Sequence, residues 1–236
     1  MTQRVNYKIV LLLVLLAACQ PKGSKQSVDT KASVPVDRFA LELILDDPGQ
    51  TDSLANKLRE TPFELYRWKN HLVLFGATTD STGIAGKLRQ SDFKLKIKKY
   101  DRPIYVFDRG LHCGDSLAAK PWRNYLLTAN LVADTAKQNE YVHDHAVQFD
   151  EYPEVAQGFC HAGFQQLIVF CEGRQLMLVI SIPGDKTLDE LNPKTVEDNP
   201  RMVEWNKRMS RYQEGIEGTA PGETWVFLES VDKGES

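Results

Sequence analysis

The sequence predicts an α+β protein built from two ferredoxin-like modules, which pack together as a dimeric α/β barrel within one chain. Each module has the element order β-α-β-β-α-β, and this order occurs twice in the roughly 200 residues after the N-terminal segment. The hairpin at 63–77 also matches the hairpin at 164–181 in apolar pattern, though not in residue identity. Two such sheets can cover each other's free apolar faces. The alternative is two independent modules with a common topology.

The first module is expected at residues 38–109. Thr51, Asp52 and Ser53 provide a helix cap, and Lys69-Asn70 separates two apolar runs as a hairpin turn would. Pro103 marks the last strand as an edge strand or a break. The expected elements are a strand at 38–45, a helix at about 52–60, strands at 63–68 and 71–78, a helix at about 81–89, and strands at 93–100 and 103–108.

The second module is expected at residues 123–230, after a connection at 110–122. It repeats the order of the first module with longer elements, and Pro153 is expected to interrupt or end its first helix. Gly173 lies in the turn of its hairpin. The expected elements are a strand at 125–132, a helix from 134 to about 158, strands at 164–170 and 176–182, helical segments at 188–191 and 199–216, and a strand at 223–229.

Residues 1–19 are typical of an export signal. Arg4 and Lys8 precede an apolar run of about ten residues, which is too short to cross a bilayer. The run ends in Leu-Ala-Ala-Cys, which resembles the lipobox of bacterial lipoproteins, so Cys19 is expected to be acylated and to anchor the protein to a membrane. Gln20 favours the outer membrane. Residues 20–37 are polar and predict a flexible tether. The alternative is an ordinary signal peptide with a chance cysteine.

Charge and cysteine content exclude several classes. The net charge is −3, and cleavage after residue 18 would remove Arg4 and Lys8 and no acid, which leaves −5. A mildly acidic chain without a basic run has no electrostatic footprint for nucleic acid. No cofactor is expected, and no metal site, because no His/Cys cluster has zinc spacing. Beyond Cys19 three cysteines remain, and we expect buried thiols, with Cys160 and Cys171 as the only pair close in sequence.

The segment 140–155 is the candidate site. It holds two histidines, two tyrosines and five carboxylates in sixteen residues. On a helix Tyr141 and His145 share one face, whereas His143 points elsewhere. A phenol and an imidazole on one face can bind a hydroxyl group and transfer a proton. The carboxylates of Asp144, Asp150, Glu151 and Glu154 are expected to form a solvated helix face, and His143 and His161 to lie on the surface.

The second half resembles the L-rhamnose mutarotase family over roughly residues 123–229. The shared pattern begins with Glu-Tyr-x-x-x-His at 140–145 and continues with an aromatic-Pro-Glu-aliphatic run at 152–155. It ends with a tryptophan and a methionine at Trp205 and Met209, followed by a closing strand at 224–228. The order and spacing of these elements carry the resemblance, since none of them is specific alone.

The resemblance implies that His145 is the proton donor, that Tyr141 and Trp205 contact the sugar, and that Asn206 occupies the position of a second tryptophan. Leu167 stands where the family has a tyrosine. The implied substrate is L-rhamnose or another deoxyhexose, whose anomers interconvert by proton transfers near the ring oxygen. A histidine with a pKa of about 6.5, exposed in a shallow pocket, suits this role. The first half then takes the place of a partner subunit, which would permit a monomer.

Two other functions stay open. A non-catalytic sugar-binding lipoprotein would keep the contacts of Tyr141 and Trp205, while the changes at Asn206 and Leu167 would abolish turnover. A scaffold would use the barrel for protein contacts only.

Overall fold

The computed structural model describes residues 37–78 and 81–231, which all fall in one compact unit. The signal peptide, Cys19 and almost all of the tether lie outside the described residues. The strands are β1 (Arg38–Leu45), β2 (Glu64–Trp68), β3 (His71–Ala77), β4 (Leu95–Tyr100), β5 (Pro103–Asp108), β6 (Trp122–Leu131), β7 (Gln166–Glu172), β8 (Gln175–Pro183), β9 (Gln213–Glu214) and β10 (Val226–Ser230). The helices are α1 (Thr51–Leu58), α2 (Ser81–Arg89), α3 (Arg109–His112), α4 (Thr135–Glu151), α5 (Pro153–His161), α6 (Leu188–Leu191) and α7 (Pro200–Met209).

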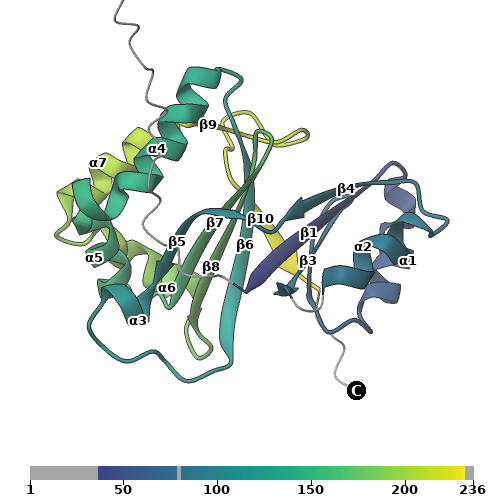
Figure 1. Cartoon of the computed structure of the whole chain (residues 1–236), viewed down its shortest axis with the longest axis horizontal. Coiled ribbons are helices and arrows are strands. Elements are labelled where there is room, and N and C mark those ends of the chain that lie inside the picture. Colours follow the sequence, from purple (N-terminus) through teal and green to yellow (C-terminus); the bar gives the residue numbers. More distant parts are fainter. Residues whose placement is uncertain (1–36, 79–80, 232–236) are drawn as a thin grey trace, which may run out of the picture. The chain divides into compact units, whose positions relative to one another are not determined.

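One antiparallel sheet runs through both halves of the chain. Its strand order is β4-β1-β3-β2-β10-β6-β8-β7-β5, and β9 pairs with β6. The strand β10 joins the halves, because it pairs with β2 on one side and with β6 on the other. At the other side β4 approaches β7, so the sheet nearly closes into a barrel. In Figure 1, α1 and α2 lie beside β1 and β3, whereas α4, α5 and α7 lie beside β5 and β7. The predicted α+β fold with an intrachain α/β barrel is confirmed.

The period of two along β1 shows why the sheet has two buried faces. Phe39, Leu41 and Leu43 point toward the helices of the first half and join an apolar core there. Ala40 points the other way, into a second core that also holds Ile168 of β7 and other side chains of both halves. Because successive side chains of a strand alternate between faces, one strand contributes to both cores. This second core lies between the sheet regions of the two halves and covers their free faces, as predicted.

A buried carboxylate lies inside the barrel. Glu42 of β1 is fully buried, and its oxygens lie 2.7 Å from Nδ1 of His71 and accept hydrogen bonds from the Tyr100 hydroxyl (2.9 Å) and the Gln175 amide (3.0 Å). Burial raises the pKa of Glu42, but His71, Lys98 and Tyr100 outweigh it and hold this pKa below its usual value. Since Gln175 belongs to β8, this network links the two halves.

Four local expectations about the fold are wrong. The segment 103–108 is expected among the strands that close the first module, but β5 pairs with β7 of the second half. The helical segment expected at 199–216 ends as an α-helix at Met209, and β9 follows at Gln213–Glu214. The last strand begins at Val226 instead of Glu223. Cysteines were expected as buried thiols, but Cys113 and Cys160 form a disulfide, and Cys171 is free. Spacing along the sequence does not indicate this pair. Cys113 follows α3 and Cys160 lies in α5, so the two cysteines are 47 residues apart in sequence but adjacent in the fold.

Other local expectations are confirmed. Pro153 separates two helices, because a proline has no N–H for the helix ladder and is favoured at a first helical position. The two hairpins form as predicted, as does the helix at 81–89. Within the described residues, no helix has the length and apolarity that a membrane span requires.

Candidate functional site

A cavity of about 460 Å³ lies between the helices of the second half and the sheet face of β7 and β8. Most of its lining is apolar and comes from α5, α7, β7, β8 and the 3-10 helix Asn192–Val196. The helix α7 contributes because Met202, Trp205 and Met209 recur at helical spacing on its buried face. The lining residues with polar side-chain groups other than indoles are Tyr105, Tyr141, His145, Asn192, Thr195, Asn206, Ser210, Gln213 and Thr224.

His145 has a defined tautomer in this cavity. Its Nδ1 lies 2.9 Å from the backbone oxygen of Tyr141, one helical turn earlier. A carbonyl oxygen only accepts hydrogen bonds, so Nδ1 carries the hydrogen in the neutral ring. The other nitrogen, Nε2, then has a lone pair, and it makes no hydrogen bond with any residue that the structure describes. At neutral pH His145 is therefore a proton acceptor through Nε2.

Three aromatic rings surround this imidazole. The ring centroids of Tyr141, Tyr105 and Trp205 lie 4.3, 5.3 and 5.3 Å from that of His145. Only 7% of His145 is exposed. Burial lowers the pKa of His145 to about 4, although its bond to the Tyr141 carbonyl and the nearby Asp144 both favour the charged form. The expected exposed histidine with a pKa near neutrality is therefore wrong, because the aromatic rings exclude the water that would solvate an imidazolium.

Tyr105 is a cavity residue that the sequence reading missed. It comes from β5, the strand placed with the first module, and its hydroxyl donates a 2.5 Å hydrogen bond to Gln148 of α4. The Gln148 amide in turn donates to the backbone oxygen of Tyr152 (2.6 Å). This chain of bonds fixes Tyr105 against His145. Only the pairing of β5 with β7 brings the strand here, and no local pattern in the sequence indicates that pairing.

A buried ion pair holds α4 and α7 together. Arg208 donates two hydrogen bonds of 2.6 Å to the carboxylate of Asp144, one from Nε and one from an amino group. The Tyr212 hydroxyl donates a third hydrogen bond to Asp144 (3.2 Å), and Arg208 donates to the Tyr152 hydroxyl (3.0 Å). Asp144 is 2% exposed, so its expected place on a solvated helix face is wrong. The pair sets the distance between the helix of His145 and the helix of Trp205.

A second group of bonds orders one end of the cavity. The Trp225 indole donates a 3.0 Å hydrogen bond to the side-chain oxygen of Gln213. The Gln213 side chain also hydrogen-bonds to Tyr141, and because this bond favours the ionised phenol and a lower pKa, the Gln213 amide group is the donor. Burial raises the pKa of Tyr141, so its hydroxyl stays protonated at physiological pH. Trp225 lies in the closing strand of the family pattern, but the resemblance assigns it no role. Gln213 falls inside the helical segment expected at 199–216, where no pattern marks it as a site residue.

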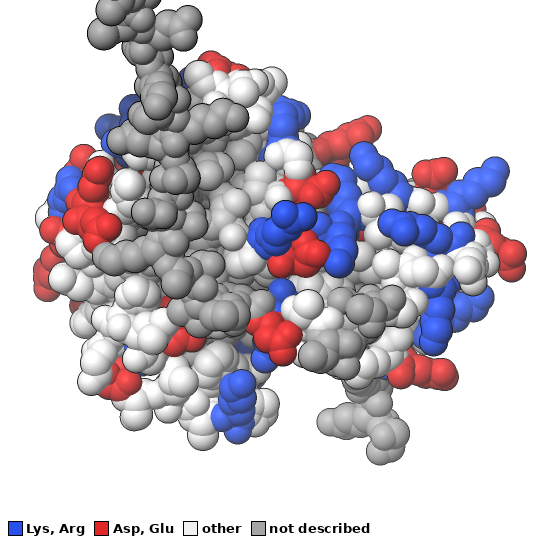
Figure 2. All heavy atoms as spheres, viewed as in Figure 1, with Lys and Arg blue, Asp and Glu red and all other residues white. Residues whose placement is uncertain are grey.

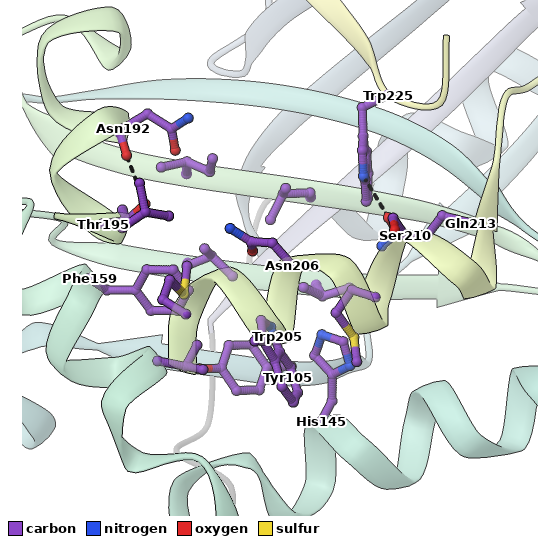
Figure 3. A pocket seen from close by; sticks show the side chains of 18 of the residues that line it. Tyr105, His145, Phe159, Asn192, Thr195, Trp205, Asn206, Ser210, Gln213 and Trp225 are labelled. Carbon is purple, nitrogen blue, oxygen red and sulfur yellow. Dashed lines mark hydrogen bonds between the residues drawn. The ribbon is translucent and has the colours of Figure 1, made fainter. Parts of the chain in front are cut away.

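The structure brings the predicted substrate-site residues together. His145, Tyr141, Trp205 and Asn206 all line the same cavity. In Figure 3, Asn206 occupies its centre, with Trp205, Tyr105 and His145 on one side and Trp225, Ser210 and Gln213 toward one end. Leu167 lines the cavity too. His143 and His161 are exposed and do not line it, as predicted for surface residues.

The cavity differs from the outer surface in its charge. In Figure 2, lysine and arginine side chains lie among aspartate and glutamate over the visible face. The described residues that line the cavity include no lysine, arginine, aspartate or glutamate. His145 is neutral at pH 7 because its pKa is about 4. Among these residues a ligand would meet no formal charge.

One family model matches the second half of the chain. Residues 125–232 match the family model described as L-rhamnose mutarotase, which is less than half of the chain. The predicted resemblance of the C-terminal half to this family is therefore confirmed. No curated protein matches the chain.

Similar solved structures have low identity. A putative monooxygenase from Fusobacterium nucleatum is 7% identical, with a TM-score of 0.45, over 83% of this chain and 92% of that chain. A staphylococcal regulator of pathogenesis is 8% identical, with a TM-score of 0.44, over 83% and 99%. A heme-degrading enzyme from Listeria monocytogenes is 10% identical, with a TM-score of 0.37, over 81% and 98%. At these values none of the three carries a functional inference.

Proposed function

We propose that the C-terminal half interconverts the anomers of a monosaccharide, with His145 as the proton-transfer group. One observation carries this proposal: His145, whose Nε2 makes no hydrogen bond with a described residue, lines the same cavity as the other predicted contacts. The match of residues 125–232 to the mutarotase family supports the same reaction class. L-rhamnose or another deoxyhexose is the substrate that the family implies.

The tautomer of His145 sets the direction of the first proton transfer. Nε2 takes the proton from the C1 hydroxyl while the bond between C1 and the ring oxygen breaks, and the imidazolium then delivers this proton to the ring oxygen. Both oxygens are bonded to C1, so one nitrogen can reach each in turn. After rotation about the C1–C2 bond, the reverse steps close the ring as the other anomer. His145 therefore acts first as a base and then as an acid.

The other residues hold the sugar. The indole of Trp205 covers an apolar face of the ring, as aromatic side chains do for carbohydrate C–H groups. The Asn206 amide offers donors and an acceptor to ring hydroxyls. The Tyr141 hydroxyl, oriented by Gln213, binds a further hydroxyl. None of these contacts requires a charged sugar.

Saturation-transfer NMR on L-rhamnose anomers tests the proposal directly. The wild-type protein is expected to exchange the anomers faster than the buffer, and His145→Ala is expected to lose about 10²- to 10⁴-fold of that acceleration. His143→Ala is the matched control, since His143 lies on the same helix, is exposed and does not line the cavity. An unchanged rate in His145→Ala would remove the catalytic role. Binding without acceleration in the wild type would favour the sugar-binding alternative.

The pH dependence of exchange gives a second test of the base. His145 must be neutral to take a proton, so the rate is expected to stay level from pH 7 to about 5 and to fall as the pH drops through about 4. A rate that halves near pH 6.5 would show an exposed, ordinary histidine instead.

We also propose that the protein is exported and anchored through Cys19, with the outer membrane as its destination. The signal-like residues 1–19 support export, and the Cys113–Cys160 disulfide is typical of oxidising compartments outside the cytosol. Cys19→Ser is expected to move the protein from the membrane fraction to the soluble fraction. A protein that stays in the membrane fraction after this change would contradict the lipid anchor.

A further inference from the structure

The cavity is larger than a single monosaccharide requires. Its volume of about 460 Å³ lies within the range of about 300–1,000 Å³ that is typical of pockets for drug-sized ligands. An unsubstituted deoxyhexose has only about eleven non-hydrogen atoms and is smaller than such ligands. A ligand that fills the cavity must therefore extend beyond the sugar ring.

The two ends of the cavity differ in their lining. His145, Ser210 and Gln213 lie toward the end of Trp225, whereas Phe159, Asn192 and Thr195 lie at the opposite end (Figure 3). The rung of Leu167 and Ile180, paired across β7 and β8, adds to the apolar lining.

The opposite end offers few hydrogen bonds to a ligand. Thr195 is buried there, and its hydroxyl already donates to the backbone oxygen of Asn192 (2.7 Å), while Asn192 itself is exposed. Sugar hydroxyls buried against Phe159 would lose their hydrogen bonds to water, which costs free energy. An apolar group in the same place has no hydrogen bonds to water that it could lose.

We propose that the substrate is a neutral monosaccharide that carries an apolar substituent of several carbon atoms. This inference rests on the proposed function for the sugar half of the ligand. The sugar ring lies near His145, Asn206 and Gln213 with its C1 hydroxyl at Nε2. The substituent is attached away from C1, which must stay free for ring opening, and lies at the end of the cavity that Phe159 lines. Because none of the described lining residues is charged, the proposed ligand is a neutral sugar and not a phosphorylated or acidic one.

Calorimetric binding of 4-O-methyl, 4-O-butyl and 4-O-hexyl L-rhamnose to the wild-type protein tests this substrate class. C4 lies across the ring from C1, so the alkyl chain points away from His145. Affinity is expected to rise about fourfold for each added methylene until the apolar end is full. Equal affinity for the three ethers would overturn the inference.

Two valine substitutions locate the alkyl group. Val196 and Val203 are both exposed valines (38% and 52%), but only Val196 lines the cavity. Val196→Glu is expected to abolish the gain from the longer chains, whereas Val203→Glu keeps it. A gain that survives in Val196→Glu would place the alkyl group elsewhere and overturn the inference.

Two further measurements separate this inference from the proposed function. If L-rhamnose anomers exchange rapidly while the hexyl ether binds no tighter than the methyl ether, the apolar substituent is wrong and mutarotation stands. If hexan-1-ol binds as tightly as 4-O-hexyl L-rhamnose, the apolar end stands and the sugar, and with it the proposed function, is wrong. A tighter hexyl ether together with weak hexan-1-ol binding supports both.

Discussion

The two halves of the molecule use the layer between helices and sheet in opposite ways. In the first half Leu54, Ala55 and Leu58 of α1 pack onto apolar side chains of the sheet and form a continuous core. In the second half the corresponding layer contains the cavity, with His145 and Asn206 among its lining residues. One topology thus supports a packed core in one half and a ligand cavity in the other.

The difference lies in side-chain chemistry and helix length. The helix α1 has eight residues and buries small and aliphatic side chains, whereas α4 has seventeen and buries Tyr141, Asp144, His145 and Gln148. Buried polar groups need partners, and the Asp144–Arg208 pair supplies one set while it holds α7 beside α4. The comparison indicates that the layer between helices and sheet forms a candidate site in the second half and a stabilising core in the first half.

Loss of the disulfide, which lies in the second half and its connection, is expected to have the largest effect on the free energy of unfolding. Cys113 and Cys160 close a loop across 47 residues of sequence, all of them in the second half or its connection. In the chain-entropy model such a loop contributes about 4 kcal/mol to the free energy of unfolding. Cys113→Ser with Cys160→Ser is expected to lower this free energy by up to that amount in urea unfolding, whereas Cys171→Ser, at the free thiol, is the control and should cost far less. Equal costs would show that the disulfide adds nothing.

Leucine truncation compares the core with the cavity. Leu54→Ala leaves a new void in the packed first half and is expected to cost about 3 kcal/mol of unfolding free energy. Leu167→Ala removes the same atoms beside an existing cavity, so it loses fewer contacts and is expected to cost about 1 kcal/mol. Thermal or urea unfolding of both variants measures the difference. A larger cost at Leu167 would contradict the assignment of the packed layer to the first half.

Acid should destabilise the folded protein through His145. Its folded-state pKa of about 4 lies below the unfolded value of about 6.5, so the unfolded chain binds the proton first. Stability is therefore expected to fall as the pH decreases from about 6.5 to about 4, by about 3 kcal/mol from this group. His145→Gln cannot titrate and should lack this part of the loss. If the unfolding free energies of wild type and variant fall by the same amount between about pH 6.5 and about pH 4, His145 is not buried as neutral imidazole.

Removing the ion pair should loosen the site with a smaller effect on stability. Asp144→Ala leaves Arg208 without its bidentate partner, and because about a third of Arg208 is exposed, we expect a cost of about 2 kcal/mol. Glu151→Ala, at an exposed position on the same helix, is the control and should stay within about 0.5 kcal/mol. Ring-current shifts of the Trp205 protons against His145 report whether α7 has moved. Equal unfolding free energies for the two variants would contradict the bracing role of the pair.

Local sequence patterns predicted most of the elements and the pairing of Tyr141 with His145, whereas Trp205 and Asn206 were implied by the family resemblance. The hairpins followed from alternating apolar residues around short turns, and the break at Pro153 followed from the chemistry of proline. Tyr141 and His145 share a face because four residues make about one helical turn. Such relations act within about ten residues of chain, which is why sequence alone can predict them.

The remaining site residues depend on pairing between distant segments. Tyr105 reaches His145 only because β5 joins the sheet of the second half, and Asp144 is buried only because Arg208 lies across from it. The Cys113–Cys160 pair likewise follows from the path of the chain and not from spacing.

The sequence by itself determined the α+β class, the repeated module order, the signal-like N-terminus and the helix face that carries His145. Long-range packing places this histidine among three aromatic rings in the lining of the cavity, with Nδ1 bonded and Nε2 free of hydrogen bonds to the described residues. The physical reason is that helix and strand patterns arise from neighbours along the chain. The pKa and tautomer of a side chain arise instead from desolvation and hydrogen bonds, which segments distant in sequence supply.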